Sequence, residues 1–316
     1  MSFNKYIILL CVLFVACKNE TNVTNQKTST PETPIEEVKP IVETPKFTMV
    51  TKEVKMDTVT VSNMVDLVDN AKSNTVLILE KGTYSLDKDL VYKMTEEERI
   101  IIDKKIVETR SIGGQMHFSG LSNFQIQGKK GAVIVSENPE AVPFFVLLCN
   151  NVKVSNLTIR KNIEGVTDLC YVSTSNEIEI DNCKFNGGGS YGIYTSNVEN
   201  VTVSNCLITN CTSGAIKIHD SRGLKYINTT ITNNSTTVPL ISFYGAGNTV
   251  TLYGVNIINN KRNVKSAFTG SENIIGLGTN SLRLENCVIR DNEGFTNLGA
   301  GQNSLYRTEI AGVAMQ

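Results

Sequence analysis

Six side chains of the kinds that recognise acidic sugars are concentrated in one part of this sequence. Two are aromatic, one is a carboxylate and three are basic: Tyr171, Tyr194, Asp220, Lys217, His219 and Arg222. The two tyrosines and Lys217 recur at equal spacing, so a repeating fold would align them in one column. Basic side chains pair with carboxylates, and aromatic faces suit sugar rings. The group therefore predicts a binding surface for an anionic sugar.

The same group has the parts needed to cleave an acidic polysaccharide by β-elimination. Lys217, His219 or a tyrosine would remove the proton beside a uronate carboxylate, and Arg222 would neutralise that carboxylate. We assign catalytic roles to Lys217, His219 and Arg222, and substrate-binding roles to the two tyrosines and Asp220. An enzyme of this kind would be a polysaccharide lyase or a glycoside hydrolase. The alternative is that all six are ordinary surface residues of a long sheet.

The composition excludes nucleic-acid binding through a broad positively charged surface. The 316 residues carry 30 Lys+Arg against 31 Asp+Glu, whereas phosphate binding needs clustered basic excess. No CxxC pair or histidine cluster indicates zinc. Glu177, Glu179 and Asp181 alternate along a single predicted strand with little support from neighbouring segments, so calcium stays only an alternative. We expect no metal and no cofactor.

The elements that position the candidate residues come from an internal repeat. The pattern apolar-x-apolar-x-Asn-small-x-apolar recurs along the chain, with Gly replacing Asn in two copies. The Asn or Gly position falls at Gly128, Asn156, Asn182, Asn205, Asn228, Gly254 and Asn286. Steps of 23 to 32 residues separate these positions, which is too long for hairpins and lies in the range of solenoid coils.

Each period also contains a second alternating run, as expected for another half-buried strand. These runs are 145–148, 169–172, 192–195, 215–218, 240–244 and 274–277. One coil of short strands cannot bury its own apolar face, but stacked coils bury it jointly. Like residues then stack on like residues, which predicts a buried ladder of hydrogen-bonded amides. Its members would be Asn156, Asn182, Asn205, Asn228 and Asn286.

Over roughly residues 75–310 this repeat resembles the right-handed parallel β-helix proteins of the pectate-lyase-like superfamily. The resemblance implies an all-β solenoid over residues 47–316, with a cap at about 47–74 that contains a short amphipathic helix at 63–72. A β-propeller or a β-sandwich would not explain Asn at a fixed place in successive coils. By analogy the fold suggests a polysaccharide partner. A non-catalytic adhesin or structural surface protein is the alternative.

The first residues predict export and a lipid anchor. The apolar run Tyr6–Ala16 is too short to span a bilayer and fits a signal peptide over residues 1–16. The segment Leu13–Cys17 resembles a bacterial lipobox, with Phe14 where Leu is usual, which implies cleavage before Cys17 and acylation of its thiol. An ordinary signal peptide cut elsewhere is the alternative. Residues 17–46 lack any period and predict a disordered tether to the bacterial outer membrane or cell surface.

Six cysteines remain after the signal peptide and the acylation candidate: Cys149, Cys170, Cys183, Cys206, Cys211 and Cys287. Three of them occupy the small inward position of the repeat, where a soft side chain stacks in the core. Cys183 and Cys206 fall in adjacent coils at a spacing that would permit a bridge. The sequence leaves their pairing open.

Overall fold

A computed structural model describes residues 54–86, 108–112, 115–162, 166–187, 189–263, 273–276, 280–299 and 305–312. Contacts within Lys52–Gln316 make this part of the chain one compact unit. The predicted signal peptide, the tether and Cys17 lie outside the described residues. Within the described part, no helix is long and apolar enough to cross a membrane.

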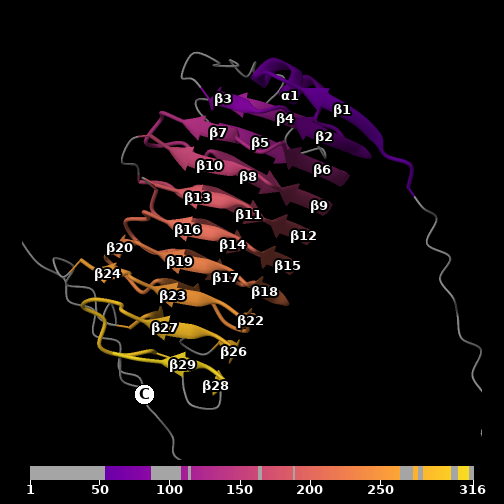
Figure 1. The fold of residues 1–316 in the computed structure, drawn as a ribbon. Helices are drawn as coiled ribbons and strands as arrows, with labels where there is room; N and C mark the ends of the chain where they lie inside the picture. The colour runs from indigo at the N-terminus through magenta and orange to yellow at the C-terminus, as the bar shows by residue number, and fades with distance from the viewer. Residues whose placement is uncertain are drawn as a thin grey trace, which may run out of the picture. The chain divides into compact units, whose positions relative to one another are not determined.

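Three parallel sheets follow the repeat, each taking one strand from successive coils (Figure 1). Sheet A contains β1 (Asp57–Val61), β2 (Thr75–Leu79), β6 (Ser122–Gly128), β9 (Asn150–Ser155), β12 (Asn176–Asp181), β15 (Glu199–Ser204), β18 (Leu224–Ile227), β22 (Thr249–Tyr253), β26 (Ser281–Glu285) and β28 (Leu305–Tyr306). Sheet B contains β3 (Gly82–Leu86), β7 (Ala132–Ser136), β10 (Thr158–Lys161), β13 (Lys184–Asn186), β16 (Leu207–Thr209), β19 (Thr230–Thr232), β23 (Asn256–Ile258), β27 (Val288–Arg290) and β29 (Glu309–Ile310).

Sheet C follows sheet B in each coil and completes the turn. It contains β5 (Gln115–Ser119), β8 (Phe144–Leu147), β11 (Cys170–Ser173), β14 (Ile193–Ser196), β17 (Ile216–His219), β21 (Ile241–Tyr244) and β25 (Ile275–Gly276), with β4 (Glu108–Ile112) added antiparallel at its first edge. A short pair, β20 (Ser235–Thr236) and β24 (Lys261–Arg262), lies outside these sheets. This arrangement is the parallel β-helix that the repeat predicts.

The core consists of inward side chains that stack in register from coil to coil. On sheet A, Ile180, Val203, Tyr226 and Leu252 occupy one such column, and all four are buried. Burial of apolar surface contributes about 25 cal/mol per Å², and each coil supplies area that its neighbours cover. The stacking therefore fixes the register of the whole sheet, and with it the outward columns.

The predicted helix near the N-terminus is present as α1 (Met64–Asn70), followed directly by Ala71. The Asn63 side chain caps α1 by accepting a hydrogen bond from the backbone N–H of Asp66 at 2.9 Å. Met64 and Leu67 are buried against the first strands. The helix thus covers apolar residues at the first coil, which no earlier coil can cover.

The prediction of a buried ladder at Asn156, Asn182, Asn205, Asn228 and Asn286 is wrong. These residues form the corner between sheets A and B, with φ of 47° to 58°, and their side chains are exposed or half-exposed. Among the described residues, one pair of them is bonded directly, Asn182 Nδ2 to Asn156 Oδ1 at 2.8 Å. Asn is favoured here because it tolerates the left-handed conformation of a sharp bend.

A buried amide ladder does exist, one corner further along each coil. Asn260 Nδ2 donates to Asn292 Oδ1 at 2.9 Å, and Asn234 Nδ2 donates to Asn260 Oδ1 at 2.9 Å. The side chains of Asn234 and Asn260 are 1% exposed. Each follows an exposed asparagine with positive φ, Asn233 and Asn259. The ladder residue therefore comes directly after the residue that makes the bend.

All six described cysteines are free and buried. Cys183 and Cys206 stack in adjacent coils, where the backbone N–H of Cys183 donates to Cys206 Sγ at 3.4 Å. Cys287 occupies the equivalent inward position further along. They act as small core residues in this structure.

Candidate functional site

The predicted column of outward residues on sheet C is present and longer than expected. Register pairs Tyr171 with Tyr194, Tyr194 with Lys217, and Lys217 with Ser242. The column also extends backward through Phe145 to His117. Four rings therefore stand in one row on consecutive strands, because each occupies the same outward position of its coil.

These rings are stacked face to face along the solenoid. The centroids lie 4.5 Å apart for His117 and Phe145, 4.8 Å for Phe145 and Tyr171, and 4.4 Å for Tyr171 and Tyr194. Interplanar angles are 2° to 11°. The prediction that tyrosine faces stack on sugar rings is therefore wrong for this arrangement, since neighbouring side chains cover those faces. Both tyrosines are half-buried, so part of each ring edge borders the solvent.

Lys217 ends the row and places its ammonium group among aromatic rings. Lys217 Nζ lies 4.2 Å from the ring centroid of Tyr194, 5.1 Å from that of Tyr244 and 5.6 Å from that of Tyr191. Ring faces attract a cation. The geometry therefore suits Lys217 to pairing with a carboxylate.

His219 lies one position further along the same strand and has a partner at each ring nitrogen. Its Nε2 is 3.3 Å from Asp220 Oδ2, and its Nδ1 is 3.4 Å from Ser196 Oγ. The imidazole is about two-fifths exposed, at 39%. A neutral imidazole that donates from Nε2 to Asp220 carries its lone pair on Nδ1, so Nδ1, beside the Ser196 hydroxyl, is the nitrogen that can accept a proton.

Arg222 lies apart from Lys217, at the corner between sheets C and A. It lines a shallow depression with Asp220, Asn197 and Glu199. The six predicted site residues thus form two adjoining groups. Lys217 belongs with the tyrosines, Arg222 and Asp220 line this depression, and the contact between His219 and Asp220 joins the two groups.

The sequence analysis missed Asp168 and Tyr191, which complete the site from the segments that precede β11 and β14. Asp168 Oδ1 accepts a hydrogen bond from the backbone N–H of Tyr191 at 3.1 Å. Burial raises the pKa of Asp168 to about 6, while the positive charge of Lys217 acts in the opposite direction. Both residues directly precede predicted strands of the same column. This position in the sequence could have identified them as neighbours of the site.

Lys161 is a second buried ionisable group near Asp168. Its ammonium group donates to the carbonyl oxygen of Pro139 at 3.2 Å and to the Thr167 hydroxyl. Burial lowers its pKa to about 8, and the charge of Asp168 opposes this shift. Lys161 is 5% exposed, so it supports the shape of the segment before β11 and is not accessible to a polymer.

Two of the three carboxylates considered for calcium are engaged by other partners, and the third, Glu177, is exposed. Glu179 pairs with Lys153 at 2.8 Å. Asp181 Oδ1 accepts hydrogen bonds from Ser204 Oγ at 2.7 Å and Asn205 Nδ2 at 2.8 Å. No group of three or more His, Cys, Asp or Glu that could hold a metal ion occurs in the described ranges.

Comparison with known proteins gives a family and a fold. The family model described as the right-handed beta helix region matches residues 144–311. A search of curated proteins finds no match. Among solved structures, a variant of Bacillus subtilis pectate lyase is 13% identical, with 82% of each chain covered and a TM-score of 0.55.

Two further pectate lyases are similar at the level of the fold. The pectate lyase Pel9A is 11% identical, with 83% of this chain and 75% of that chain covered and a TM-score of 0.55. A pectate lyase bound to a hexasaccharide is 13% identical, with 82% of each chain covered and a TM-score of 0.52. At these identities the likeness concerns the fold alone.

Proposed function

Since this chain belongs to the right-handed β-helix family, we propose that its sheet C face binds and processes an acidic extracellular polysaccharide. The observation that carries this proposal is Lys217, whose ammonium group lies among three tyrosine rings on the outward side of the sheet. A uronate carboxylate pairs with this ammonium group. The fold likeness to a pectate lyase bound to a hexasaccharide supports a carbohydrate ligand.

The binding roles follow from which atoms remain available. The exposed edges of Tyr171 and Tyr194 contact the sugars, because the ring faces are covered. Asp220 orients His219. A chain lying along the stacked row would cross several coils, so successive sugars meet successive side chains of the column.

For cleavage, the arrangement supports β-elimination. His219 removes the proton beside the uronate carboxylate, while Lys217 neutralises the charge that develops on that carboxylate. Arg222, which lies apart from Lys217, pairs with the carboxylate of an adjacent sugar. The electron pair of the broken C–H bond forms the new C=C bond, and the glycosidic C–O bond breaks. The departing oxygen takes up a proton, which leaves one unsaturated uronate end and one new hydroxyl end.

We further propose that the protein acts at the bacterial outer membrane or cell surface. Acylation of Cys17 would anchor it, and residues 17–46 would hold the β-helix away from the lipid. Two anchoring signals are usually needed for stable attachment by acyl chains, and a lipobox cysteine provides more than one chain. Detergent partitioning of the full chain and of a Cys17→Ser variant tests this membrane attachment.

The non-catalytic alternative also has an observation in its favour. A row of four stacked rings is rigid and regular along the axis, as a structural or adhesive surface would require. Binding without products would support it.

The pKa of Asp168 gives a sharp test of the sheet C site. Below about pH 6 this carboxyl is mostly neutral and no longer competes for Lys217, whereas uronates stay ionised. Affinity for polygalacturonate, measured by calorimetry on residues 46–316, should rise as the pH falls through about 6. An Asp168→Asn variant should bind tightly at both pH values and lose most of this dependence. An unchanged pH dependence in that variant would count against the proposed site.

A further inference from the structure

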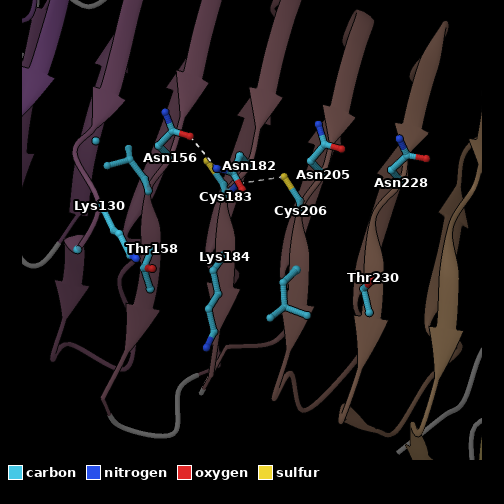
Figure 2. A pocket seen from close by; sticks show the side chains of 14 residues that line it. Lys130, Asn156, Thr158, Asn182, Cys183, Lys184, Asn205, Cys206, Asn228 and Thr230 are labelled. Atoms are coloured by element: carbon cyan, nitrogen blue, oxygen red, sulfur yellow. Dashed lines mark hydrogen bonds between the residues drawn. The ribbon is translucent and has the colours of Figure 1, made fainter.

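A groove follows the corner between sheets A and B, on a different part of each coil from the sheet C site. Figure 2 shows its lining side chains in successive coils. We call it the corner groove, and its lining residues include Lys130, Asn156, Thr158, Asn182, Lys184, Asn205, Leu207, Asn228 and Thr230. The proposed sheet C site uses none of these residues.

The groove arises from the left-handed corner residues. Asn156, Asn182, Asn205 and Asn228 each turn the backbone at positive φ, and small buried residues such as Cys183 and Cys206 follow them. Coils in a parallel sheet are spaced by about 4.8 Å. The corner groove therefore presents one amide side chain per coil, in a row along the solenoid axis.

Much of the hydrogen-bonding capacity of these amides is unused. Asn182 Nδ2 donates to Asn156 Oδ1, and Asn205 Nδ2 donates to Asp181 Oδ1, both at 2.8 Å. Each amide has two donor hydrogens and two acceptor positions, so every one of these side chains keeps groups free for a ligand. The hydroxyls of Thr158 and Thr230 lie along the same groove.

Two lysines line the groove, and the one carboxylate bonded to its asparagines, Asp181, is already engaged by Asn205 and Ser204. Figure 2 shows Lys130 and Lys184 on the same side of the asparagine row. Elsewhere on the surface Lys129 pairs with Glu80 and Lys153 pairs with Glu179. No carboxylate within the described part of the chain pairs with Lys130 or Lys184. Their charges therefore remain available to an anionic ligand.

We propose that the corner groove is a second binding site, which holds the extended chain of a linear acidic polysaccharide along the solenoid axis. An extended pyranose chain advances by about one coil spacing per sugar, so successive hydroxyls meet successive asparagines. Lys130 and Lys184 pair with its carboxylates, and Leu207 contacts the apolar face of a sugar ring. This site stands on its own residues and does not depend on the sheet C site.

The test is binding of polygalacturonate and of alginate to residues 46–316 carrying Lys130→Gln and Lys184→Gln. The matched control carries Lys72→Gln and Lys225→Gln, two exposed lysines outside the groove, and has the same net charge. We expect the groove variant to bind at least one of the two polymers about three- to tenfold more weakly, in the range that two solvent-exposed ion pairs supply. The control should bind as the unaltered protein does.

Three outcomes would overturn the corner groove. In the first, the groove variant binds as tightly as the unaltered protein. In the second, the groove variant and the control lose the same affinity, which would indicate a general charge effect. In the third, the unaltered protein binds neither polymer. A variant of Lys217 in the same titration separates the two sites. If the Lys217 variant loses binding and the groove variant keeps it, the corner groove is refuted and the sheet C proposal is unaffected. If the groove variant loses binding and the Lys217 variant keeps it, the sheet C site alone is refuted.

Discussion

Replacement of both Lys217 and His219 by alanine should abolish cleavage of an acidic polysaccharide while the solenoid stays folded. Lys217→Ala removes the ammonium group that faces three tyrosine rings, and His219→Ala removes the candidate base. Loss of a positioned general base alone costs roughly 10²- to 10⁴-fold in rate. Turnover should be measured as kcat/KM, with circular dichroism as the check on folding.

A double variant at matched positions provides the control. Lys225 and Thr202 are outward residues in register on sheet A, away from the rings, and their replacement by alanine should leave turnover unchanged. Both proteins should unfold at similar urea concentrations, because the altered side chains are outward and β-propensity differences are within about 1 kcal/mol. Full activity in the Lys217/His219 variant would show that the site lies elsewhere.

Asn260→Ala should destabilise the β-helix by about 4 kcal/mol or more. Its amide has five hydrogen-bonding contacts: the two Nδ2 hydrogens are shared among the carbonyls of Ile231 and Ile258 and Asn292 Oδ1, and Oδ1 accepts from the backbone and side chain of Asn234. Removing this amide leaves several buried partners unsatisfied, at about 1–3 kcal/mol each. Urea unfolding followed by circular dichroism measures the loss.

The neighbouring Asn259 offers a matched control. Asn259 is exposed and has φ of 55°, a conformation that glycine adopts without strain. Asn259→Gly should change the free energy of unfolding by less than about 1 kcal/mol. Similar losses for the two variants would mean that the buried ladder does not stabilise this corner.

The fold could be predicted from the sequence because stacked coils require similar residues at equivalent positions, and this repeat is visible in the sequence. Apolar alternation marked the strands, and equal spacing placed Tyr171, Tyr194 and Lys217 in one column, as the register confirms. The amide ladder was assigned to the wrong residues for a physical reason. Asparagine is favoured both where the backbone bends with positive φ and at the buried position that follows, and composition alone does not separate the two.

The rest of the candidate site could not be predicted because it depends on segments without a fixed length. Asp168 and Tyr191 precede strands of sheet C, in connections that differ from coil to coil. Their burial and their mutual hydrogen bond follow from how adjacent connections pack. Stacking of the tyrosine faces likewise depends on rotamers, which the column position does not determine.

The most direct measurement is a screen of residues 46–316 against acidic and neutral polysaccharides. Binding is recorded together with the ultraviolet absorbance of unsaturated uronates in the same samples. The proposed site predicts binding of uronate polymers over neutral ones, with a rise in absorbance that is lost in the Lys217/His219 variant. A folded protein that binds no uronate polymer, or binds neutral polymers equally well, would contradict the proposed function.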